Sequence, residues 1–156
     1  MNVIVPSNIT DALKAALMSA GSREIGGILL GEHTNPNEFK VCEITIQKTG
    51  GGIAFFERIV KQIVKPIKKF FARTGYNYKK FNYLGEWHSH PSFSPHPSKV
   101  DHLTMQELIQ DKEFGAHFIV LMIIRLELGN LMGSVTIYQD GNKPYSGNLI
   151  FNENAM

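Results

Sequence analysis

The stretch GEWHSHPSFSPHPSKVD, residues 85–101, links a strand pattern to a helix start through a loop rich in proline. The letters NYLGEWHSH, residues 82–90, predict a core strand in which Trp87 is buried. Pro91 ends that strand, because proline cannot donate to a hydrogen-bond ladder. SKVDHLTMQELIQDK, residues 98–112, is typical of a helix. The stretch therefore predicts a strand, a loop and a helix, in that order.

His88 and His90 are two residues apart in the predicted strand. Side chains alternate with a period of two, so both imidazoles project from one face, with Cα atoms roughly 6–7 Å apart. That spacing allows both rings to bind one ion. Asp101, at the start of the helix, can reach back as a third ligand. Three protein ligands and an open position are typical of catalytic zinc sites.

Ser98 and Asp101 also fit a second interpretation that needs no metal. Serine at the cap of a helix, followed three residues later by an acid, is a signature of a helix N-terminus. The two interpretations are compatible, since a capped helix start also fixes the position of the carboxylate. The fragment alone leaves both open.

A hydrolytic metal site also needs a base, and three glutamates are candidates: Glu24, Glu32 and Glu86. Glu86 shares the strand face of His88. Glu24 directly precedes the apolar strand IGGILLG, residues 25–31, in which two glycines would let another backbone pass close by. The position of Glu24 is equally consistent with a solvated strand end.

The rest of the chain mixes strand and helix patterns without strict alternation. Strands are expected at residues 2–5, 24–33, 39–48, 117–127 and 131–140, and residues 147–151 add a strand or pack on the sheet. Helices are expected at residues 9–19, capped by Ser7 or Asn8 and ended by Gly21, and at residues 57–73, kinked or restarted at Pro66. This order predicts an α/β fold with a mixed sheet in one domain, residues 1–156.

Composition narrows the function classes. A formal net charge of +2 is too small to argue for nucleic acid binding, and the lysine-rich residues 61–80 are typical of a solvated face. Cys42, the single cysteine, lies in an alternating strand pattern and is expected to be a core or half-buried residue rather than a reactive one. No leader pattern precedes the first strand, and residues 117–124 are too few to span a bilayer. A cytoplasmic protein without membrane or nucleic acid partners is expected.

Together these residues resemble the signature of the JAMM, or JAB/MPN-plus, metalloprotease family: an upstream glutamate, then His-Ser/Thr-His, seven residues, Ser, two residues, Asp. The chain has Glu24, His88-Ser89-His90, seven residues from 91 to 97, Ser98 and Asp101. The resemblance covers nearly the whole chain. It implies a mixed, mostly antiparallel sheet flanked by helices, related in fold to the cytidine deaminases.

The resemblance also implies a role for each matching residue. His88, His90 and Asp101 would bind one Zn²⁺. Glu24 would hold the attacking water, act as base and pass the proton to the leaving amine. Ser98 would donate a hydrogen bond to the developing oxyanion.

The resemblance further implies the substrate and the partners. The family cleaves amides, commonly the isopeptide bond after the C-terminal glycine of ubiquitin or a ubiquitin-like protein. The short chain resembles bacterial members of antiphage operons, which have E1-like and E2-like partners. Ile53, Phe55 and Phe56, on a glycine-rich stem, are candidates for holding the substrate tail. Cleavage of a linear precursor and a non-catalytic scaffold are the alternatives.

Overall fold

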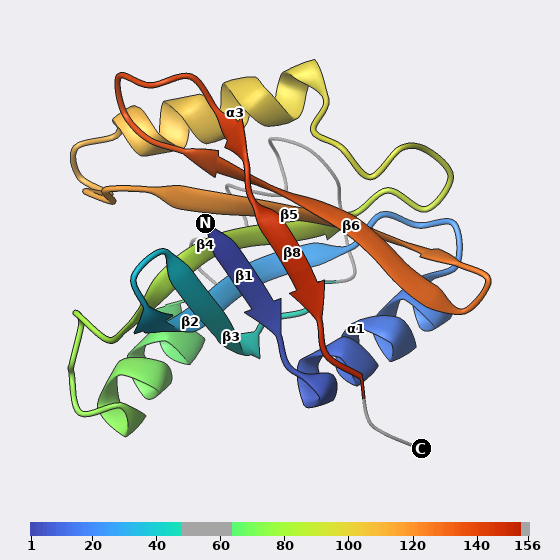
Figure 1. The fold of residues 1–156 in the computed structure, drawn as a ribbon, viewed down its shortest axis with the longest axis horizontal. Coiled ribbons are helices and arrows are strands. Elements are labelled where there is room, and N and C mark those ends of the chain that lie inside the picture. The colour runs from blue at the N-terminus through green and yellow to red at the C-terminus, as the bar shows by residue number, and fades with distance from the viewer. Residues whose placement is uncertain (48–63, 154–156) are drawn as a thin grey trace.

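The computed structural model describes residues 1–47 and 64–153, and Figure 1 shows how its helices and strands are arranged. Residues 64–73 are helical and carry no label. The other elements are, in chain order, β1 (Asn2–Val5), α1 (Ser7–Ala20), β2 (Gly26–Asn35), β3 (Glu38–Ile44), β4 (Phe81–Ser89), α3 (Lys99–Gln110), β5 (Ile119–Glu127), β6 (Asn130–Tyr138), β7 (Tyr145–Ser146) and β8 (Asn148–Phe151).

The strands form one eight-stranded sheet in the order β7-β6-β5-β4-β2-β3-β1-β8. β1 runs parallel to both β3 and β8, and β4 runs parallel to β5. The other neighbouring pairs are antiparallel, so the expected mixed, mostly antiparallel sheet is confirmed. The sheet curls until its two ends meet, since β7 and β8 stand at opposite ends of the strand order and only Gly147 separates them.

Helices cover both faces of this sheet. The apolar side of α1, including Leu13 and Leu17, packs inside the curl against β3, β5 and β6. On the other face, Met105 and Ile109 of α3 pack on β5, and Phe70 of the helix at 64–73 packs on β2. Burying these apolar faces supplies most of the driving force for folding, at about 25 cal/mol per Å² removed from water.

The expected elements are confirmed within the described residues, with one correction. Neither Ser7 nor Asn8 caps the first helix: the helix begins at Ser7, its cap is Pro6, and no side chain caps it. Only Pro6 separates β1 from α1, so the Pro6 carbonyl accepts the Thr10 N–H directly. Cys42 is half-buried, as expected.

Two expectations reach residues outside those the structure describes. The helix expected from residue 57 is described only from residue 64, and it runs through Pro66. Ile53, Phe55 and Phe56, the candidates for holding a substrate tail, lie outside the described residues and stay a prediction. In residues 1–47 and 64–153, no helix is long and apolar enough to cross a membrane.

Candidate metal centre

The end of β4 is fixed by hydrogen bonds on both sides. Ile25 N–H donates to Ser89 Oγ over 3.0 Å, and Ser89 N–H donates to the Ile25 carbonyl over 2.8 Å. On the other side, His90 N–H donates to the Ile124 carbonyl of β5 over 2.9 Å. The backbone that carries the two histidines is therefore held between β2 and β5.

Gly26 explains how β2 comes so close to this segment. It pairs with His88 across the antiparallel ladder. A Cβ added at Gly26 would lie 2.5 Å from the Trp87 carbonyl oxygen and 3.0 Å from His88 Cβ. Any larger residue would push the two strands apart. Trp87 points to the opposite face, is completely buried, and donates through Nε1 to the Thr45 carbonyl.

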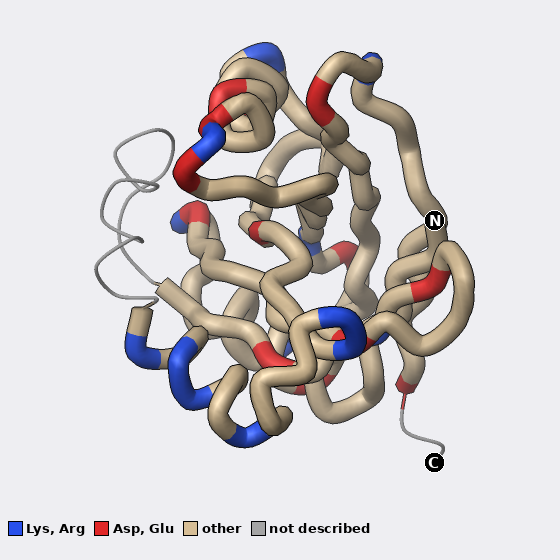
Figure 2. Tube along the Cα trace, turned by 90° about the vertical axis from the view of Figure 1, so that its left-hand side faces the viewer, with Lys and Arg blue, Asp and Glu red and all other residues tan. Residues whose placement is uncertain are grey.

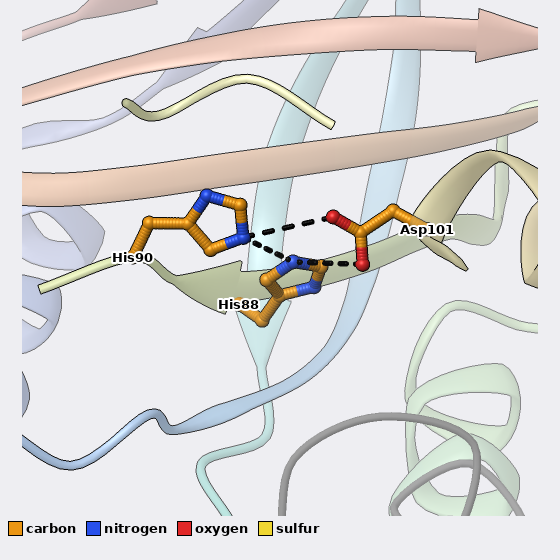
Figure 3. Close-up of side chains that lie close together, drawn as sticks. All are labelled: His88, His90 and Asp101. Carbon is orange, nitrogen blue, oxygen red and sulfur yellow. Dashed lines mark hydrogen bonds and ion pairs between the residues drawn. The ribbon is translucent and has the colours of Figure 1, made fainter. Parts of the chain in front are cut away.

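The imidazoles of His88 and His90 and the carboxylate of Asp101 converge on one point (Figure 3). The two Nε2 atoms are 3.1 Å apart. His88 Nε2 lies 3.5 Å from Asp101 Oδ1, and His90 Nε2 lies 3.6 Å from Asp101 Oδ2. Ligand atoms about 2.0–2.1 Å from a tetrahedral zinc ion are about 3.3 Å from one another. The three side chains thus have the spacing to bind one divalent ion.

The hydrogen bond on the far side of His90 selects the tautomer that a metal needs. His90 Nδ1 lies 2.8 Å from the Ser94 carbonyl oxygen. A carbonyl only accepts, so Nδ1 carries the proton, and Nε2 of the neutral ring presents a lone pair to the other two ligands. Phe93 stacks on the same ring, with centroids 4.1 Å apart. The proline-rich loop therefore orients this ligand.

Asp101 is held by a capping box at the start of α3. Its N–H donates to Ser98 Oγ over 3.1 Å, while the Ser98 N–H donates to Asp101 Oδ2 over 2.8 Å. Burial alone would raise the pKa of Asp101, but the facing His88 and His90 rings and the Ser98 N–H lower that pKa far below its usual value. The carboxylate is therefore ionised, as a metal ligand must be. Capping and ligation coexist in one residue.

His90 shows the matching electrostatic effect. Burial opposes protonation of its ring, yet Asp101, the Ser94 carbonyl and Glu24 together raise the pKa of His90. Its side chain is 4% exposed, while those of His88 and Asp101 are 22% and 17% exposed. The cluster is open to solvent on the side of His88 and Asp101. A water or a substrate atom can approach from there.

The three candidate bases differ in their position relative to the two histidines. Glu24 is exposed and directly precedes Ile25. The Ile25 N–H is hydrogen-bonded to Ser89, the residue between His88 and His90. Its charge acts on His90. Glu32 lies toward the other end of β2 and pairs with Lys40 and Lys80.

Glu86 shares the strand face of His88, as expected, but it is buried. Burial raises the pKa of Glu86 to about 8, so at neutral pH it is protonated and cannot accept a proton. Of the three glutamates, Glu24 alone is exposed and adjoins the residue, Ile25, that is hydrogen-bonded to Ser89 between the two histidines.

Sequence reasoning missed the groups that hold the proline-rich loop. The Arg125 guanidinium donates to the Phe93 carbonyl, and Ser134 Oγ donates to the Pro95 carbonyl. Both reach the loop from β5 and β6, more than thirty residues away. Their partners are backbone carbonyls, which leave no residue pattern in the sequence.

Histidines outside the cluster fall into two groups. His33, His96 and His117 are exposed. His102, next to Asp101, lies 2.8 Å from the buried Tyr138 hydroxyl through Nδ1. It therefore helps attach the first turn of α3 to β6.

Comparisons with known proteins agree with this architecture. A family described as prokaryotic homologs of the JAB domain matches residues 6–135. A protein named CD-NTase/cGAS isopeptidase, from Enterobacter hormaechei subsp. hoffmannii (strain UCI 50), is 26% identical over 125 residues, covering 78% of this chain and 66% of that protein. This chain thus matches just under two thirds of the relative's length.

Among solved structures, the solution structure of protein DSY2949 from Desulfitobacterium hafniense has the same fold. Its TM-score is 0.59 at 18% identity, and the match covers 97% of this chain and 94% of that one. The family match runs from α1 to β6 and includes the clustered histidines and aspartate. The chain belongs to the prokaryotic family of JAB domains.

Proposed function

We propose that this protein is a zinc-dependent isopeptidase that hydrolyses the amide bond after the C-terminal glycine of a ubiquitin-like protein. The observation that carries the proposal is the convergence of His88, His90 and Asp101 at tetrahedral spacing, with Glu24 beside them. Membership of the JAB-domain family and the name of the curated relative support it.

The donor set favours zinc. Two imidazole nitrogens and one carboxylate oxygen are ligands that zinc accepts, and three protein ligands leave one position free for chemistry. When bound, the ion would polarise the scissile carbonyl and lower the pKa of water toward about 7. His90 is preset as a ligand by the Ser94 carbonyl, and Asp101 by the cap of α3.

Glu24 and Ser98 transfer the proton and stabilise the developing charge, respectively. The exposed Glu24 carboxylate takes a proton from the attacking water and returns it to the leaving amine. The Ser98 hydroxyl accepts from the Asp101 N–H, so its own proton is free to donate to the oxygen that gains charge. The Ser98 hydroxyl oxygen thus accepts the capping hydrogen bond, and the hydroxyl hydrogen is available to donate during the reaction.

The substrate class follows the curated relative. That protein is named an isopeptidase of CD-NTase/cGAS, and we extend the isopeptide chemistry to this chain. A lysine of a nucleotidyltransferase of that kind, joined to the C-terminus of a ubiquitin-like protein, is the proposed substrate. A role in antiphage defence, with E1-like and E2-like partners, is proposed from the resemblance to bacterial members of the JAMM family.

The test compares Glu24→Gln with Glu107→Gln, an exposed acid on α3 that serves as matched control. Substrates are two synthetic peptides in which a C-terminal Gly-Gly is joined to lysine through its ε-amine or through its α-amine. Zinc content is measured alongside cleavage. We expect about one zinc per chain in all proteins, and cleavage of the ε-linked peptide by wild type and Glu107→Gln but not by Glu24→Gln.

Each other outcome identifies an alternative. Preference for the α-linked peptide would make the protein a peptidase of linear precursors. Zinc bound at full stoichiometry without cleavage of either peptide would refute the proposed substrate class. Absence of zinc, with the fold intact, would place the protein among non-catalytic scaffolds.

A further inference from the structure

A second hollow lies at the opposite end of β4 from the metal centre. It has a volume of about 560 Å³, which is within the range of binding pockets in proteins. β4 lines it at Asn82–Leu84, four to six residues before His88. At about 3.3 Å per residue, the two sites are roughly 13–20 Å apart. We call this hollow the aromatic groove.

Aromatic side chains from separate segments form the walls of the aromatic groove. Phe71, from the helix at 64–73, meets Tyr78 edge to face at 4.9 Å. Tyr83 of β4 meets Phe114 in the same way at 5.2 Å. Gly31 and Leu84, both buried, also line the groove. The lining is therefore mostly apolar, which suits apolar side chains of a ligand.

The charge around the aromatic groove is positive. Lys79 and Lys80 line it, together with two histidines, and no acidic residue does. Glu32, next to the lining residue Gly31, is paired with Lys40 and Lys80 at 3.1 and 3.6 Å. Lys79 makes no ion pair with any described residue. An anion on this rim would therefore meet an unpaired lysine and no acidic lining residue.

The positive charge continues beyond the groove. Lys65, Lys68 and Lys69 lie on the adjoining helix, and among residues 1–47 and 64–153 none of them has an ion pair. In Figure 2, blue outnumbers red at the lower left of the molecule. The surface thus combines an apolar hollow with lysines on its rim and further lysines on the adjoining helix.

We propose that the aromatic groove binds an acidic segment of a partner protein, with one or two aromatic or aliphatic side chains inserted into it. A nucleotide would need hydrogen-bond partners for its base within the hollow, and the lining is largely apolar. The further lysines on the adjoining helix fit an extended chain with several carboxylates. The proposal does not depend on the metal centre or on the proposed reaction.

The test is a peptide-display selection on the purified full-length protein, followed by fluorescence anisotropy with the most enriched peptide. We expect enriched sequences to carry Asp or Glu next to Phe, Trp or Leu. Phe114→Ala and Lys79→Glu should each weaken binding by at least about fivefold, which corresponds to about 1 kcal/mol. Phe114 is 39% exposed and Lys79 is exposed, so neither change removes core.

Two controls are matched in chemistry. Met18→Ala removes an exposed apolar side chain from α1, and Lys143→Glu reverses an exposed lysine between β6 and β7. Both should bind like wild type. Circular dichroism of each variant checks the fold.

Three outcomes would overturn the proposal. One is a selection that enriches no acidic, apolar motif. Another is an enriched peptide whose binding is unchanged in Phe114→Ala and Lys79→Glu. The third is binding of a single-stranded oligothymidylate, lost in Lys79→Glu, when no peptide binds, which would assign the surface to nucleic acid instead.

Discussion

Glu86 offers a test of the core beneath the candidate metal centre. Its side chain is almost completely buried, and Oε1 has no hydrogen-bond partner among the described residues. Burial raises its pKa from the ordinary value of 4.5 to about 8. The perturbation is Glu86→Gln, which keeps the shape of the side chain and removes its titration.

The magnitude follows from proton linkage. Between pH 4.5 and about 8 the unfolded chain has lost this proton while the folded protein keeps it, so unfolding releases a proton. The free energy of unfolding of wild type therefore falls as pH rises, by up to about 1.4 kcal/mol per pH unit. From about pH 5 to about pH 7.5 the loss from Glu86 sums to about 3 kcal/mol.

Glu86→Gln does not suffer this loss. Burying an amide has its own cost, but that cost is independent of pH and drops out of the comparison. We therefore expect the stability of the variant relative to wild type to increase by about 3 kcal/mol over the same pH interval. Other groups titrate equally in both proteins and cancel.

The assay is urea unfolding at several pH values, followed through the fluorescence of Trp87, the single tryptophan of the chain. Both proteins are treated with a chelator first, because a nearby cation would lower the pKa of Glu86. A stability difference that stays constant within about 0.5 kcal/mol across the interval would refute the reasoning. It would mean that the carboxylate is solvated or paired in the folded protein.

Three further predictions concern the metal centre. Gly26→Ala should destabilise the protein by about 1–3 kcal/mol in thermal unfolding, because its Cβ would meet the carbonyl of the facing strand; an unchanged midpoint would show that β2 can move away. Ser98→Ala should lower stability by about 1 kcal/mol and weaken zinc binding in a competition titration. Ser98→Thr should keep both the stability and the zinc affinity of wild type, since threonine can also cap. Equal zinc affinity in all three proteins would show that the helix cap does not influence metal binding. Zinc at about a hundred times its Kd should raise the stability of wild type by about 2.7 kcal/mol and that of His90→Ala much less, and an equal gain in both would place the ion elsewhere.

Local patterns were sufficient for much of the fold. The strand at 82–90 and the helix after Ser98 were predicted because period-two alternation and a capping signature are properties of neighbouring residues. The cap of the first helix was predicted wrongly. Ser7 and Asn8 are good capping residues, but the short connection from β1 places Pro6 at that position instead.

The sequence by itself determined which side chains can form the metal cluster. His88 and His90 share a face through strand geometry, and the cap of α3 fixes Asp101, so the ligand set is encoded over a short distance. Only the tertiary structure decided the rest. It separated the glutamates by burial, placing Glu24 at the surface and Glu86 in the core. It also assembled the aromatic groove from segments far apart in the chain. Burial and long-range contacts depend on how the sheet curls and which helices cover it, and no local pattern of residues records that.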